Sequence, residues 1–84
     1  MIPRKNIVVT SADGEVDVSA YGSVAFAIEA TDGDVTFTKL EEVDMAGETD
    51  TSDLKDETLR DGKVFYGRFV TVHCAANEVT VHFK

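Results

Sequence analysis

Apolar and polar residues alternate along much of this chain with the two-residue period of a β-strand. Val24, Phe26 and Ile28 would share one face of such a strand, with small or charged residues on the other face. The same alternation recurs at residues 35–38 and in shorter runs elsewhere. Helix signals are nearly absent, since only one short stretch could form a turn or two. The pattern therefore predicts an all-β chain.

Three Asp-Gly pairs separate these runs, at residues 13–14, 32–33 and 61–62. Asp-Gly suits tight turns that need a positive φ angle. We therefore expect a single all-β domain over residues 1–84, built as a small antiparallel β-sandwich or open barrel of about six to seven short strands. Its predicted core consists of Val24, Phe26, Ile28, Val35, Phe37, Val70, Val72, Val79 and Val81.

The last two alternating runs predict a β-hairpin with its turn at Ala76 and Asn77. The expected cross-strand pairs are Cys74 with Val79, Val72 with Val81, Val70 with Phe83, His73 with Thr80 and Thr71 with His82. This register makes one face wholly apolar and the other wholly polar, and a slip of one residue would destroy both faces. A bulge or bend at Gly67 would turn Phe65 toward the core.

Charge is unevenly distributed along the chain. Sixteen acidic residues against eight basic ones give a net charge of −8, which argues against direct binding to a nucleic-acid backbone. Residues 41–57 hold eight acids and one lysine, a net charge of −7. We expect this segment to be a long acidic loop, and loops of that length are usually functional or disordered.

The acidic loop has three interpretations: a solvated segment that prevents association, a cation site, or a surface that engages basic partners or imitates nucleic acid. An EF-hand alignment that starts at Asp50 places Leu54 at a ligand position and lacks the turn glycine, so a calcium motif is absent. The candidate partner-binding residues are Glu41, Glu42, Asp44, Asp50, Asp53, Asp56 and Glu57.

The remaining chemistry-bearing residues form no recognisable site. Cys74 is the only cysteine, so the monomer has no disulfide, and its neighbour His73 points to the opposite strand face. His73 and His82 would lie diagonally on one face, yet two imidazoles without a third ligand do not make a zinc site. We predict no catalytic residue, no cofactor-binding residue and no metal site, and we do not expect an enzyme.

A family resemblance is carried by residues 62–83. The matching features are Gly62, Tyr66, Gly67, Phe69, the turn at residues 75–77, and Val79 with Val81. This run resembles the C-terminal end of small tailed-phage virion proteins, although Ala-Ala-Asn-Glu stands where a Ser-Gly turn is more usual. The acidic segment has no counterpart in that pattern. The resemblance implies a non-enzymatic protein that decorates or joins a capsid or tail, in several copies, with a capsid or other virion protein as its partner.

The leading functional hypothesis is therefore a structural or accessory virion protein that acts through protein–protein contacts and can form a homo-oligomer. The first alternative is an acidic inhibitor that imitates nucleic acid, and the second is a ligand- or carbohydrate-binding module. Residues 1–20 contain no apolar run preceded by basic residues, so no signal peptide is expected. No apolar stretch approaches membrane-spanning length, so no membrane partner is expected either. The expected location is the virion for a phage protein and the cytoplasm otherwise.

Overall fold

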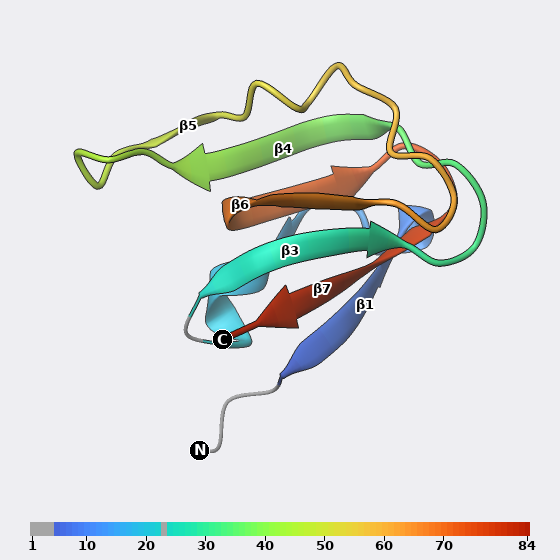
Figure 1. Ribbon diagram of the computed structural model, residues 1–84, viewed down its shortest axis with the longest axis horizontal. Helices are drawn as coiled ribbons and strands as arrows, with labels where there is room; N and C mark the ends of the chain where they lie inside the picture. The colour runs from blue at the N-terminus through green and yellow to red at the C-terminus, as the bar shows by residue number, and fades with distance from the viewer. Residues whose placement is uncertain (1–4, 23) are drawn as a thin grey trace.

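A computed structural model describes residues 5–22 and 24–84, and these residues form one antiparallel sheet (Figure 1). Its seven strands are β1 (Asn6–Thr10), β2 (Val16–Asp17), β3 (Ala25–Ala30), β4 (Phe37–Val43), β5 (Thr49–Thr51), β6 (Val64–Cys74) and β7 (Glu78–Phe83). Two short 3-10 helices, η1 (Ser11–Asp13) and η2 (Val18–Ala20), flank β2. The predicted all-β fold is confirmed, and the sheet does not close into a barrel. In the described part of the chain, no helix is long and apolar enough to span a bilayer.

The sheet is organised around its longest strand, β6. The strand order is β1-β7-β3-β6-β4-β5, and β2 pairs with β6 outside this path. Residues 64–69 of β6 pair with β3, whereas residues 69–74 pair with β4. The sheet curls, with β3, β7 and β1 following one edge of β6 and β4 and β5 following the other (Figure 1).

The predicted pairing of the last two strands is wrong. In the described residues β6 and β7 are not neighbours, because β3 lies between them and pairs with both. Ala27 in β3 stands opposite Tyr66 on one side and His82 on the other. The short connection turns at Asn77, whose φ is 60° and whose side-chain amide donates to the Asp34 carbonyl at 2.7 Å. The predicted apolar face is nevertheless buried at Val72, Cys74, Val79, Val81 and Phe83, because alternation defines the buried face of a strand and not its neighbour.

Most of the predicted core is confirmed; two of the three exceptions fall at bulges, and the third, Val24, precedes β3. Ile28, Val35, Phe37, Val72, Val79 and Val81 are buried. Val24, Phe26 and Val70 are only half-buried. Phe26 is an extra residue of β3 relative to β7, so the alternation shifts and Ala25 joins Ile28 in the core. Val70 is likewise an extra residue of β6 relative to β4, and Phe69 is buried in its place.

A third irregularity corresponds to the bulge predicted at Gly67. Between the pairs of Ala25 with Phe69 and Ala27 with Tyr66, β6 contains one residue more than β3. Phe65 is consequently half-buried and packs against the core. The core also contains residues that the sequence analysis did not select, among them Ile7, Val9, Val18, Leu40, Leu59, Cys74 and Phe83.

The three Asp-Gly turns are confirmed by their backbone angles. Gly14, Gly33 and Gly62 have φ values of 69°, 90° and 79°, in the region that residues with a Cβ rarely adopt. All three lie between strands or 3-10 turns, as the sequence predicts.

Candidate functional site

The acidic segment 41–57 is a hairpin rather than the single long loop that the sequence predicts. Its first residues complete β4, and Glu42 stands opposite Asp50 across the pairing with β5. The turn is closed by Asp44, whose Oδ1 accepts the backbone N–H groups of Ala46 and Glu48 at 2.9 Å each. Asx-type bonds of this kind replace a backbone turn contact. We call the segment from Glu41 to Thr51 the acidic hairpin.

The acidic hairpin is anchored to the body of the protein just beyond β5. Ser52 is only 5% exposed, and its hydroxyl donates to Glu42 Oε2 at 2.8 Å. Its backbone N–H donates to the Leu40 carbonyl at 2.8 Å. Leu54 packs against the core, and two turn bonds, from Lys55 to Ser52 and from Glu57 to Leu54, order the chain that follows. The acidic side chains are therefore held on a fixed backbone.

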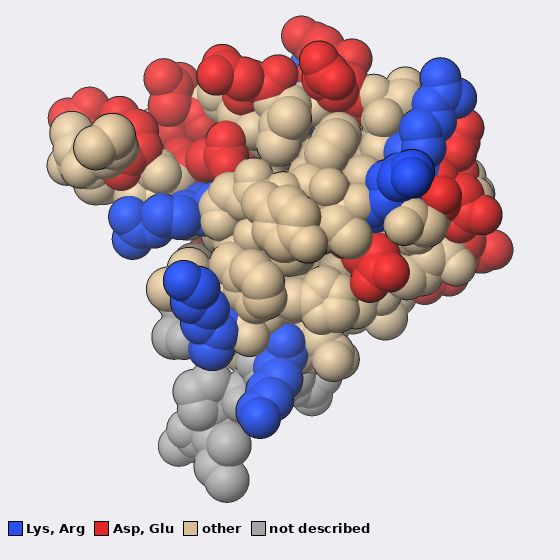
Figure 2. All heavy atoms as spheres, in the orientation of Figure 1, with Lys and Arg blue, Asp and Glu red and all other residues tan. Residues whose placement is uncertain are grey.

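The candidate acids differ in how far their charge is compensated. Glu41 lies 3.7 Å from Lys39, and Asp56 lies 3.2 Å from Lys55. In the described part of the chain, the other five candidates make no ion pair; they are Glu42, Asp44, Asp50, Asp53 and Glu57. Figure 2 shows acidic side chains along β5 and the connection after it, at the upper edge of the molecule.

Four of these carboxylates line an open hollow of about 450 Å³, together with Gly67 and Arg68 of β6. The four are Glu42, Asp44, Asp50 and Asp53. Their arrangement does not form a metal centre, because no group of three or more potential ligands among the described residues could hold an ion. The hollow is therefore an acidic recess on the surface, with Arg68 at its β6 wall.

Met45 stands at the tip of the acidic hairpin with its side chain fully exposed, at 105% of the reference area. The sequence suggests that Met45, Val43 and Leu54 together pin the acidic segment to the domain. Leu54 does pack against the core, but the expectation is wrong for Met45. An unshielded methionine between Asp44 and Glu48 is the feature that the sequence analysis missed, and only the position of the turn reveals it.

The two histidines and the cysteine lie apart from this site. His73 stands opposite Lys39 in the register of β4 and β6. His82 Nε2 lies 3.1 Å from Glu29 Oε1. Cys74 is 1% exposed, and burial, followed by the nearby Asp13 charge, raises the pKa of its thiol to about 11. A thiol with so high a pKa is a poor nucleophile near neutral pH.

Comparison with known proteins gives no match: no protein-family model, no curated protein and no solved structure is significantly similar to this chain.

Proposed function

We propose that this chain is a non-enzymatic accessory protein that binds a basic protein partner through the acidic hairpin. The main support is the fully exposed Met45, placed at the tip of an ordered hairpin and flanked by carboxylates. A flexible thioether fills an apolar recess on a partner readily, and charges around it steer the encounter and select the partner. Interfaces commonly combine such an apolar anchor with a polar rim.

The order within the hairpin also supports this proposal. The Asp44 turn bonds and the Ser52–Glu42 bond fix the backbone before any partner arrives. A surface that is already ordered loses less conformational entropy on binding, so more of the contact free energy appears as affinity. A solvated loop that only prevents association would need neither bond.

The setting that we propose comes from the resemblance to tailed-phage virion proteins. The partner would then be a basic surface on a capsid or tail protein, contacted by several copies of this chain. The strand–turn–strand order of the resemblance is present in β6 and β7, although the two strands do not pair with each other.

Site-specific photo-crosslinking would test the proposed hairpin contact. A photoreactive amino acid at position 45 should capture a basic protein from an extract of the natural host. The matched control carries the same group at Tyr66, which is 70% exposed on β6 and outside the hairpin. The double variant Asp50→Asn/Asp53→Asn should reduce capture at position 45 and weaken its dependence on salt. Equal capture at positions 45 and 66 would contradict the proposal.

The alternative function, imitation of nucleic acid, is favoured by one observation: four of the seven candidate acids, Glu41, Glu42, Asp44 and Asp50, stand on an ordered hairpin. Competition separates the two functions. Double-stranded DNA should displace the captured partner from a mimic, because both would occupy one nucleic-acid site. Capture that DNA does not change supports an ordinary protein contact.

A further inference from the structure

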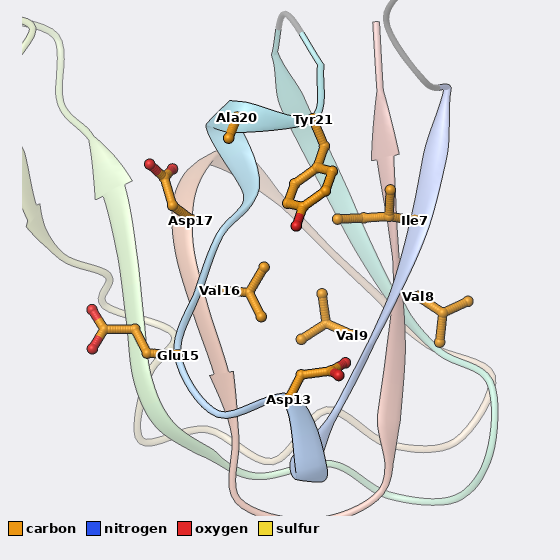
Figure 3. A pocket seen from close by; sticks show the side chains of 9 residues that line it. All are labelled: Ile7, Val8, Val9, Asp13, Glu15, Val16, Asp17, Ala20 and Tyr21. Carbon is orange, nitrogen blue, oxygen red and sulfur yellow. The ribbon is translucent and has the colours of Figure 1, made fainter.

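A groove runs along the seam where the sheet fails to close, between β1 and β2 (Figure 3). It encloses about 510 Å³, and its lining includes Ile7, Val9, Val16 and Tyr21. Figure 3 shows the side chains of Ile7 and Val9 pointing from β1 toward Val16 and Tyr21 across the groove. We call this feature the seam groove. It lies on different strands from the acidic hairpin.

One wall of the seam groove is an unpaired strand edge. Among the described strands, β1 pairs only with β7. The Phe83 N–H donates to the Lys5 carbonyl, and the Ser11 N–H donates to the Asn77 carbonyl. Lys5 and Ser11 therefore both form their backbone hydrogen bonds toward β7. Residues of an antiparallel strand face alternate neighbours, so Ile7 and Val9 bond toward β7, and the peptide groups of Asn6 and Val8 point away from it. An exposed edge of this kind is a template for a further strand.

The side chains define what such a strand would carry. The interior of the groove is apolar, because Ile7, Val9 and Val16 line it beside the Tyr21 ring. Its rim is acidic, and none of the described residues that line it is basic. The nearest compensation comes from Lys39, which lies 2.9 Å from Glu15. A strand lying in the seam alternates between the interior and the mouth, so apolar residues would face inward and basic residues would face the carboxylates.

We propose that the seam groove binds an extended polypeptide segment of alternating apolar and basic residues, which adds to β1 as a new strand. The segment completes the backbone hydrogen bonds of Asn6 and Val8, covers the partly exposed Val16 and Tyr21 side chains and pairs with Asp13, Glu15 and Asp17. This site is independent of the acidic hairpin, so either proposal can fail without the other.

Peptide binding tests the proposal directly. The probe is the fluorescein-labelled peptide Ser-Ile-Lys-Val-Lys-Ile-Lys-Ser, followed by fluorescence anisotropy with the full chain. The control peptide has glutamate in place of each lysine. It should bind at least roughly tenfold more weakly, because its carboxylates would face the carboxylates at the rim of the groove. Equal affinity for the two peptides would overturn the proposal.

A proline scan tests strand addition. Val8→Pro removes the outward N–H of β1 while leaving the bonds to β7, and the Val8 side chain is already 52% exposed. This variant should bind the lysine peptide roughly tenfold more weakly. The matched control is Thr49→Pro on β5, the other free edge of the sheet, where the N–H also faces outward. It should bind as the unmodified chain does, and circular dichroism shows whether both variants fold.

Charge variants and amide exchange test the proposal without relying on proline. Glu15→Gln/Asp17→Asn should weaken peptide binding and flatten its salt dependence, whereas Asp32→Asn/Glu78→Gln, with the same net charge, should change neither. In the unmodified chain, the lysine peptide should slow exchange of the Asn6 and Val8 amides. Peptide binding that leaves those amides unprotected, or that survives Val8→Pro unchanged, would overturn the strand-addition proposal.

Discussion

Gly67 leaves room for the carboxylate of Glu42, which lies over β6 from the neighbouring strand β4. A Cβ atom at this glycine would overlap Glu42 Oε1 and stand 3.0 Å from the ring of Phe69. In Gly67→Ala we expect the flexible Glu42 side chain to swing outward and leave the buried Ser52 hydroxyl without its acceptor. Urea unfolding should show a loss of about 1–3 kcal/mol, the usual cost of an unsatisfied buried polar group.

The double-mutant cycle with Glu42→Ala identifies the cause of that loss. If Gly67→Ala acts by displacing Glu42, the glycine substitution should cost clearly less once Glu42 has been shortened. An equal cost in both backgrounds would place the clash at Phe69 instead.

The Asp34 carboxylate accepts two hydrogen bonds whose strength depends on pH. The Asp61 backbone N–H donates to its Oδ1 at 2.9 Å, and Arg60 Nη1 donates to its Oδ2 at 3.0 Å. The Asp61 bond first, and the Arg60 bond second, hold the pKa of Asp34 below its ordinary value of 3.8. Because the folded-state pKa is the lower one, the stabilisation is complete above the unfolded value and is lost as the pH falls through the folded value.

The lowered pKa of Asp34 predicts how its carboxyl group titrates in the folded protein. Its carboxyl carbon, followed by NMR, should titrate with a midpoint below 3.8. Asp34→Asn should be less stable than the unmodified chain at neutral pH, and the difference should shrink as the pH falls below 3.8. A midpoint at or above 3.8, or a difference that does not depend on pH, would contradict the contact.

At the scale of elements, the acidic hairpin depends on Asp44. Asp44→Ala removes the acceptor for the N–H groups of Ala46 and Glu48, so their amides should exchange faster and the turn should lose about 1 kcal/mol of local stability. Asp44→Asn keeps an acceptor oxygen and should restore most of the protection. If the two variants exchange alike, the charge of Asp44 rather than its hydrogen bonds orders the turn.

The bulges of β6 predict a contrast between two valines of the same strand. Val72 is fully buried, whereas Val70 is half-buried because it is the extra residue opposite β4. Val72→Ala should cost about 2–3 kcal/mol, from two lost methyl groups and the cavity they leave, and Val70→Ala should cost less than about 1 kcal/mol. Urea unfolding of both variants measures these losses of stability. Equal losses would mean that Val70 is a core residue and would contradict the bulge at that position.

These elements also show what the sequence can predict. The strands and the Asp-Gly turns follow from local signals, namely a two-residue period and a glycine with positive φ. The position of β3 between β6 and β7 has no local signal, because the faces of the last two strands suit a hairpin equally well. Bulges at Phe26 and Val70 shift the alternation by one residue, so the core assignment failed at those residues.

The candidate site was predictable to a similar extent. The density of acids in residues 41–57 identified the segment. Acidic residues have a low β-propensity, so the sequence did not predict the strand β5 within it. Pairing with β4 and the Ser52 anchor outweigh that propensity. The seam groove depends on an edge that β1 leaves unpaired, and the sequence of β1 does not specify which strands will be neighbours.

At the scale of the whole molecule, Cys74 reports on cooperative unfolding. It lies at the end of β6, the strand that pairs with β2, β3 and β4, and its Sγ is 3.7 Å from the Val9 carbonyl of β1. Because the thiol is 1% exposed, a reagent can reach it only when elements on both sides of the core separate. Its raised pKa, about 11, further lowers the thiolate fraction of the folded state at neutral pH.

We therefore expect Ellman's reagent to leave Cys74 unmodified in native buffer and to label it fully in concentrated urea. At intermediate urea, the opening free energy derived from the labelling rate should equal the unfolding free energy from circular dichroism, because one curled sheet has no separate part that can expose this strand alone. A labelling free energy well below the global value would show that β1 opens independently of the rest of the sheet. That outcome would also mean that the seam groove widens in the folded protein, since β1 forms one of its walls.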